Sequence, residues 1–143
     1  MRFIILTAVL AVFGCTQASV PSASTQPSVS AFGISDLVRE LRSSGLTVEG
    51  AGEIRQPFFS PKARVFRLNG SDLQVYEYAD AAAAEREAAT VAPEGGSIGT
   101  SMVAWLATPH FFRKDRVIAI YIGSDQQVVA HLGKIMGEQF AGR

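Results

Sequence analysis

The sequence predicts an α+β domain, in which an antiparallel sheet of about five strands has its helices packed on one face. Three observations predict it. Apolar residues recur at helical spacing near both ends of the folded part, strand-like segments occur in succession with turn residues between them, and such segments are followed by helices. The expected order is α-β-β-β-α-β-β-α. The chain has 143 residues, 48% of them hydrophobic, which suffices for one domain with a core.

The first helix is expected from an apolar stripe at the spacing of one helical face, formed by Ile34, Leu37, Val38 and Leu41. Ser35 suits the N-cap position, and Gly45 lies where a glycine commonly ends a helix. A short strand, 46–49, is expected to follow. The glycines at 50 and 52 then predict a bulge or a bend.

The clearest hairpin signal lies at residues 63–78. Its centre is Asn69-Gly70, a pair that tolerates the positive φ values of a tight turn. Asp80 is the expected N-cap of an alanine-rich helix over 81–92. Because alanine side chains are small, this helix is expected to lie close against the sheet.

The second half of the domain is expected to add further strands and a last helix. Segments 101–108 and 111–123 have the composition of strands, with a turn at residues 113–115. The last helix is expected to begin near Ser124 or Asp125. Its apolar face is made of Val128, Val129, Leu132, Ile135, Met136 and Phe140.

Composition excludes several classes of function. Lys and Arg total 13 and Asp and Glu total 13, whereas a nucleic-acid-binding protein usually carries a basic surface. One Cys rules out an intramolecular disulfide and a Cys-rich zinc site, and two distant His argue against a His-based metal site. The glycine-rich loop 95–100 lacks the Gly-Lys-Ser/Thr ending of a phosphate-binding loop and leads into a strand. We therefore expect no metal, no cofactor and no nucleic-acid partner.

The N-terminal segment has the layout of an export signal. Arg2 stands beside an apolar run over residues 3–13 that is broken only by Thr7. This run has the length of a secretory h-region, roughly 7–15 residues, and falls short of the roughly 20 that a spanning helix needs. It ends in Val12-Phe13-Gly14-Cys15.

This ending resembles the lipobox of bacterial lipoproteins, an aliphatic residue followed by two further residues and a Cys. Val12 matches the aliphatic position and Gly14 the small residue before the cleaved bond, whereas Phe13 departs from the usual small residue. The resemblance implies cleavage before Cys15 and a diacylglyceryl thioether on it. Two or more acyl chains anchor a protein stably to a membrane. The alternative is an ordinary cleaved signal peptide with an incidental Cys.

The expected organisation is therefore a lipoprotein signal peptide over 1–14, a lipidated Cys with a tether over 15–31, and one α+β domain over 32–143. The tether contains five Ser and two Pro, with no charged or aromatic side chain, a composition typical of flexible linkers. The expected location is the bacterial cell envelope, on a membrane surface outside the cytoplasm. The folded part is similar to small uncharacterised α+β domains on bacterial lipoproteins, and this similarity implies no activity.

Aromatic residues are the main candidates for a binding surface. The default expectation for nine Phe in a domain of this size is interior packing. If some face outward, they form a hydrophobic groove or a partner patch. The candidates are Phe58, Phe59, Trp105, His110, Phe111 and Phe112.

These observations favour a lipid-anchored, non-enzymatic binding or accessory module, whose partner is an envelope protein or a small ligand. Two alternatives stay open. One is a small envelope hydrolase with His110 as general base, which requires a Ser or a carboxylate within hydrogen-bond distance of the imidazole. The other is an interaction or inhibitory module whose sheet edge pairs with another protein.

Overall fold

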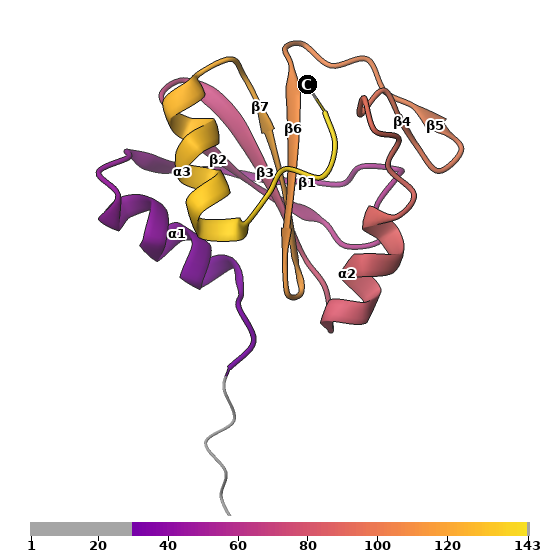
Figure 1. The fold of residues 1–143 in the computed structure, drawn as a ribbon, viewed down its shortest axis with the longest axis horizontal. Helices are drawn as coiled ribbons and strands as arrows, with labels where there is room; N and C mark the ends of the chain where they lie inside the picture. Colours follow the sequence, from indigo (N-terminus) through magenta and orange to yellow (C-terminus); the bar gives the residue numbers. More distant parts are fainter. Residues whose placement is uncertain (1–29, 143) are drawn as a thin grey trace, which may run out of the picture.

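A computed structural model of the chain describes residues 30–142. Within this range, helices surround a five-stranded antiparallel sheet, and a two-stranded sheet lies beside it (Figure 1). The predicted signal peptide and the lipobox residues Val12, Gly14 and Cys15 lie outside the described residues. No helix within the described range is long and apolar enough to cross a membrane.

The elements follow one another as α1 (Ile34–Ser43), β1 (Val48–Ile54), β2 (Ala63–Leu68), β3 (Ser71–Glu77), α2 (Ala81–Ala88), β4 (Ser97–Ile98), β5 (Ser101–Met102), β6 (Pro109–Lys114), β7 (Val117–Ile122) and α3 (Gln126–Met136). The α+β class and the predicted order of the main elements are confirmed. The strands β4 and β5 pair with each other in the small second sheet, and Ile98 of β4 also forms an isolated bridge to Val91.

The large sheet has the strand order β1-β2-β3-β7-β6, and every neighbouring pair is antiparallel. The predicted hairpin joins β2 to β3, and its turn residues Asn69 and Gly70 have φ values of 49° and 83°. The predicted irregularity near the first strand is a bulge between Gly50 and Gly52. Both local signals were readable because a two-residue turn and a glycine bulge depend on few neighbours.

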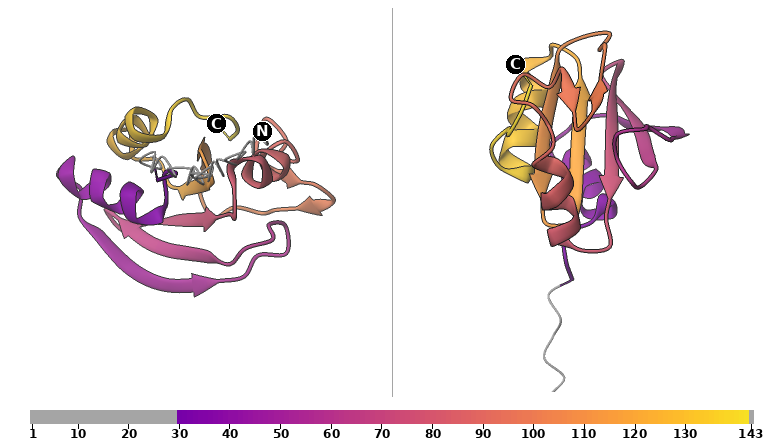
Figure 2. Two further views of the ribbon diagram at one scale, coloured as in Figure 1. Left: turned by 90° about the horizontal axis from the view of Figure 1, so that it is seen from below. Right: turned by 90° about the vertical axis from the view of Figure 1, so that its right-hand side faces the viewer.

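The helices do not share one face of the sheet, so that prediction is wrong. Helices α1 and α3 pack on one face, and α2 packs on the opposite face (Figure 2). Strand β7 accounts for this, because Val117, Ala119 and Tyr121 join the cluster under α1 and α3. The alternate residues Ile118 and Ile120 join the cluster under α2. A strand that is apolar on both sides requires cover on both sides.

The helix starts follow from their caps. The Asp80 carboxylate accepts a hydrogen bond from Ala83 N at 2.7 Å, as predicted. Asp125, one of the two expected starts of the last helix, accepts one from Gln127 N at 2.9 Å. The N-cap of α1 is Gly33, not Ser35. There the Asp36 carboxylate accepts a hydrogen bond from the Gly33 amide at 3.0 Å.

The outer edge of β6 is covered by the segment of residues 139–142. Phe111 N donates to Ala141 O at 2.9 Å, and Phe140 N donates to Phe111 O at 2.9 Å. This segment runs beside β6 after leaving α3 (Figure 1). Phe140, predicted on the apolar face of the last helix, therefore lies beyond its end and against the edge strand.

One buried hydroxyl gives a stability prediction. Tyr121 is fully buried, and its hydroxyl has no hydrogen-bond partner among the described residues. A buried polar group without a partner costs free energy, so Tyr121→Phe is expected to raise the free energy of unfolding by about 1 kcal/mol. The measurement is urea unfolding at neutral pH.

A matched variant provides the control. The Tyr76 hydroxyl, on the same sheet, donates to Gln74 Oε1 at 2.9 Å. Tyr76→Phe removes that hydrogen bond and is expected to lower the free energy of unfolding by about 1 kcal/mol. Equal losses in the two variants would contradict the assignment.

Candidate flap cleft

The structure does not bring the six predicted patch residues together on one surface. Phe59 and Phe111 belong to the core cluster under α2, whereas Phe112 belongs to the cluster under α1 and α3. Phe58 and Trp105 are half-buried at the margin of the α2-side cluster. The interior packing expected by default therefore accounts for Phe59, Phe111 and Phe112.

His110 is buried and bonded to neutral groups. Its Nδ1 lies 2.9 Å from Gln139 Oε1, and its Nε2 lies 3.1 Å from the Gly123 carbonyl oxygen. The ring stacks against Tyr121. Within residues 30–142, neither a Ser nor a carboxylate is hydrogen-bonded to this imidazole, so the arrangement that the hydrolase alternative requires is not found. His110 instead joins β6 to the 139–142 segment.

A second hydrogen-bonded cluster surrounds Glu87 on α2. Its Oε2 accepts from Tyr78 Oη at 2.7 Å and from Ser60 N at 3.0 Å, and its Oε1 accepts from the Ser60 hydroxyl. Burial opposes ionisation of this carboxyl, but the hydrogen bonds from Ser60 and Tyr78 outweigh burial and lower the pKa of Glu87. A carboxylate with a lowered pKa is a weak general base at neutral pH, so Ser60 is not activated here.

The same cluster predicts acid sensitivity. Folding lowers the pKa of Glu87 from 4.5, so its carboxylate stabilises the fold above pH 4.5. This contribution is lost as the pH falls below that value and through the lower pKa of the folded state. We expect Glu87→Gln to lose about 1 kcal/mol of unfolding free energy at pH 7 and to lose less than wild type on acidification to about pH 3.

Urea unfolding at several pH values checks this expectation. Glu85→Gln is the matched control, because Glu85 is exposed on the same helix. The control is expected to follow the wild-type pH dependence. If Glu87→Gln and Glu85→Gln give the same profile, the carboxylate of Glu87 does not stabilise the fold.

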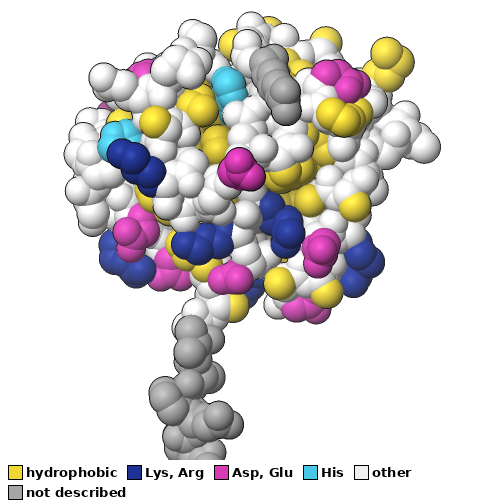
Figure 3. Space-filling model, viewed as in Figure 1, with side chains coloured by type: hydrophobic (Ala, Val, Ile, Leu, Met, Phe, Trp, Pro, Cys, Tyr) yellow, Lys and Arg dark blue, Asp and Glu magenta, His cyan; other side chains and the backbone are white. Residues whose placement is uncertain are grey.

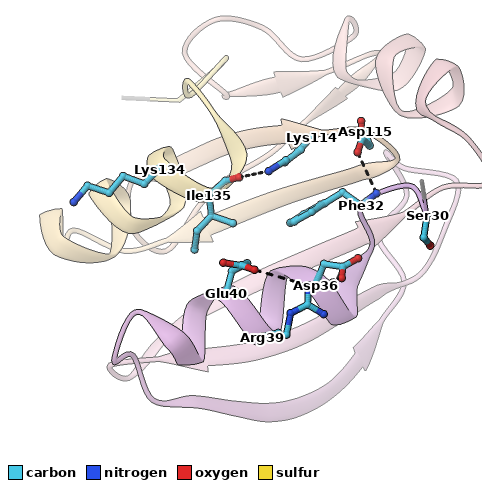
Figure 4. Close-up of a pocket in the computed structure, with 9 residues that line it drawn as sticks. All are labelled: Ser30, Phe32, Asp36, Arg39, Glu40, Lys114, Asp115, Lys134 and Ile135. Atoms are coloured by element: carbon cyan, nitrogen blue, oxygen red, sulfur yellow. Dashed lines mark hydrogen bonds and ion pairs between the residues drawn. The ribbon is translucent and has the colours of Figure 1, made fainter. Parts of the chain in front are cut away.

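A groove of about 610 Å³ lies between the start of α1, the β6–β7 turn and the end of α3 (Figure 4). We call it the tether groove, because Ser30 and Phe32 line it. Phe32 N donates to Asp115 Oδ2 at 3.1 Å. Lys114 Nζ donates to the Ile135 carbonyl at 2.7 Å and lies 4.5 Å from the centre of the Phe32 ring.

The remaining charges of the tether groove are largely paired within the protein. Arg39 lies 2.7 Å from Asp36 Oδ1 and 3.8 Å from Glu40 Oε1. Hydrogen bonds from the Gly33 amide and from Arg39 lower the pKa of Asp36, so the pair is ionised at neutral pH. The groove therefore fastens the beginning of the domain to the sheet and offers few free polar groups to a ligand.

A smaller cleft of about 450 Å³ lies on the α2 side of the sheet. Its cover is the segment of residues 99–108, which we call the flap, and we call the hollow the flap cleft. The sequence predicts a strand over 101–108, but only Ser101 and Met102 pair, within the small sheet. The strand prediction is wrong here because the flap is fixed by side-chain and loop contacts. Trp105 Nε1 donates to the Gly95 carbonyl at 2.7 Å.

Gln74 lies in the wall of the flap cleft formed by the sheet. This side chain is 7% exposed and is one of two buried polar residues within the described range. Its Oε1 accepts from Tyr76 Oη at 2.9 Å and from Gln56 Nε2 at 3.5 Å. Among residues 30–142, no acceptor is hydrogen-bonded to its Nε2. Buried polar groups are normally satisfied, so this amide nitrogen is a candidate donor to a molecule in the cleft.

Other residues complete the cleft. Arg67 and Asp72 form an ion pair of 3.3 Å on its rim, and both side chains are largely exposed. Trp105 packs against Phe58 and Phe111, with ring centres 6.1 and 5.8 Å apart. These contacts hold the indole in place. The sequence predicts Trp105 only as a member of an aromatic patch.

The flap also carries the most exposed apolar side chains. Met102 is 94% exposed and Leu106 is 102% exposed. On the face shown in Figure 3, hydrophobic side chains protrude over the β4–β5 region, whereas basic and acidic side chains are interspersed mainly in the lower half. The surface in this view has no field of one sign.

The described residues hold no recognisable metal site, and comparison with known proteins assigns the chain no function. Within the described residues, no group of three or more His, Cys, Asp or Glu side chains is arranged to hold a metal ion. Comparison of the chain with protein-family models, with curated proteins and with solved structures found no match. The geometry of the flap cleft is therefore the main guide to function.

Proposed function

We propose that the protein is a lipid-anchored, non-enzymatic binding module of the bacterial cell envelope, whose ligand occupies the flap cleft. The observation that carries the cleft assignment is the buried Gln74 amide, which has no acceptor for its Nε2 within residues 30–142. Small-molecule sites are typically concave and mostly apolar, with a few placed polar groups. The cleft combines both kinds of side chain, with Trp105, Val103 and Ile122 beside Gln74 and Gln56.

The anchor is supported by the lipobox-like ending at Cys15 and by the Ser/Pro-rich segment that follows it. The placement of the cleft agrees with such an anchor. Phe32 is bonded to Asp115 at the β6–β7 turn, whereas the cleft residues Asp72 and Ile122 pair at the other end of the sheet. Six residues of strand separate these ends, about 20 Å. The cleft thus lies at the end of the sheet opposite to the one near Phe32, where the proposed tether joins the domain.

The two alternatives have less support. The hydrolase alternative lacks a Ser or carboxylate at His110, as described above. An edge-pairing module would require an open strand edge, and the edge of β6 is covered at Phe111. The outer edge of β1 is bulged and carries the exposed Glu49 and Glu53, features that oppose pairing with another strand.

The anchor is tested by the mass of the protein extracted in mild detergent from its own host. We expect the mass of residues 15–143 plus acyl groups, and we expect Cys15→Ala to carry no acyl group. A wild-type protein without acyl groups would overturn the anchor and point to a secreted soluble protein.

The cleft is tested on the same extracts by native mass spectrometry. We expect wild type and Met102→Ala to retain the same small ligand, because Met102 is exposed and does not line the cleft. Gln74→Met is expected to lose it. A ligand retained equally by all three proteins would contradict the cleft assignment. The assignment would also be contradicted if the extracted protein carried no ligand and bound none from envelope fractions.

A further inference from the structure

The charges of the flap cleft favour a neutral ligand. Its lining contains one cation and one anion, Arg67 and Asp72, and these are already paired at 3.3 Å. A charged ligand would have to compete with that ion pair for one of its members. A neutral ligand can bond to both groups and leave the pair intact.

The polar groups of the cleft match a ligand that both donates and accepts hydrogen bonds. The Gln74 amide nitrogen and the Arg67 guanidinium donate, and the Asp72 carboxylate accepts. They stand on neighbouring strands of one sheet, β2 and β3. A row of hydroxyl groups satisfies such a mixed set, because each hydroxyl donates once and accepts twice.

The apolar side of the cleft offers a flat surface. Trp105 lines it together with Ile122 and Val103, and the indole N–H is already bonded to Gly95. The indole therefore contributes to this site mainly through its apolar ring surface. A pyranose ring presents C–H groups on one face and hydroxyl groups around its edge, so it can contact such a ring and the sheet-borne polar groups at once.

A peptide fits the site less well. Peptides that extend a sheet need free main-chain N–H and C=O groups at an edge strand. The cleft lies over β2, β3 and β7, each of which is paired on both sides. The side chains must therefore provide the specificity.

We propose that the flap cleft binds a neutral saccharide, with its apolar face against Trp105 and its hydroxyl groups on Gln74, Arg67 and Asp72. This inference rests on the proposed function and names the ligand class of the same cleft. The proposed site combines residues of the flap and of β3, which are far apart in the sequence and meet only in the folded chain.

The chain contains a single Trp, so its fluorescence reports directly on this cleft. The full chain in mild detergent is titrated with cellohexaose, chitohexaose and maltohexaose, and calorimetry follows the same titrations. We expect at least one hexasaccharide to shift the emission of Trp105 and to bind with measurable heat. Hexagalacturonate, an anionic saccharide, is expected to bind at least tenfold more weakly.

Variants connect binding to the named groups. Gln74→Met keeps a side chain of similar length without donors, and we expect it to weaken binding roughly tenfold, the factor of one hydrogen bond. Trp105→Phe, followed by calorimetry, is expected to weaken binding by a similar factor. Met102→Ala is expected to bind as wild type does. Cooperative thermal unfolding of each variant establishes that it is folded.

The possible failures are distinguishable. If no hexasaccharide binds at millimolar concentration, while the host-extracted protein retains another ligand that Gln74→Met loses, the saccharide proposal is overturned and the proposed function stands. If neither saccharide nor retained ligand depends on Gln74, both are overturned. Equal binding by wild type and Gln74→Met also overturns the saccharide proposal.

Discussion

Phe111→Ala is expected to lower the free energy of unfolding by about 3–5 kcal/mol, the usual cost of removing a buried Phe. Phe111 is 0% exposed, and its ring lies 5.8 Å from that of Trp105 and 5.9 Å from that of Phe140. Its backbone also holds the 139–142 segment through two hydrogen bonds. The free energy of unfolding of a single domain is commonly only about 5–15 kcal/mol, so this loss is a large fraction of it.

Thermal unfolding checks the expectation, with a fall in Tm of roughly 10–20 °C. The emission of Trp105 is expected to move to longer wavelength, because the cavity admits water beside the indole. Phe140→Ala is the matched control, since Phe140 touches the same ring but is 36% exposed. A Phe111→Ala protein with the Tm of the control would contradict the placement of this ring in the core.

Deleting residues 139–143 is expected to lower the free energy of unfolding by about 3 kcal/mol and to cause association of the protein. The deletion removes both backbone bonds to Phe111 and the bond between Gln139 and His110. It also removes the bond from Gly142 N to the Pro93 carbonyl. The edge of β6 is then left open, and open strand edges pair with other chains.

Urea unfolding and light scattering measure the two effects. Phe140→Ser serves as the control, because it keeps the backbone hydrogen bonds and changes only a partly exposed side chain. The control is expected to remain monodisperse if the wild-type protein is. A truncated chain that unfolds and scatters like wild type would show that the segment contributes little to the sheet.

Local signals in the sequence predicted the Asp80 cap and the turn at Asn69-Gly70 correctly. Asp80 and Asp125 accept amide hydrogen bonds from the next residues of their own helices, and Asn69-Gly70 closes a two-residue turn. The physical reason is that these features involve residues at most three positions apart. Ser35 is not the cap, because Gly33, two residues earlier, takes that position and its amide donates to the Asp36 carboxylate.

Non-local features were not predictable in the same way. The position of α2 on the second face depends on how the chain crosses from β3 to β4, and no residue within the helix specifies it. The apolar residues on both sides of β7, from Val117 to Tyr121, were the available signal. They indicate that both faces of the sheet are covered, which is incompatible with helices on one face only.

The candidate site was missed for a related reason. Gln74 alternates with Leu73 and Val75, and such alternation usually places the polar residue in solvent. The flap covers it instead, because residues 103–108 leave the small sheet and pass over the α2 side of β3. Segment 101–108 has the composition of a strand, so its sequence does not indicate that it leaves the sheet. Its position depends on contacts such as the hydrogen bond from Trp105 to the Gly95 carbonyl, which the sequence does not reveal.

The late position of α3 and the 139–142 segment has a consequence for biosynthesis. Val128, Leu132 and Met136 complete one core cluster, and Ala141 completes the other. Neither cluster can close until the ribosome has passed these codons, so this domain has no finished core until residue 141 has been added. For a chain exported through a membrane channel, as proposed here, this order of elements keeps the polypeptide open enough to be threaded before it folds.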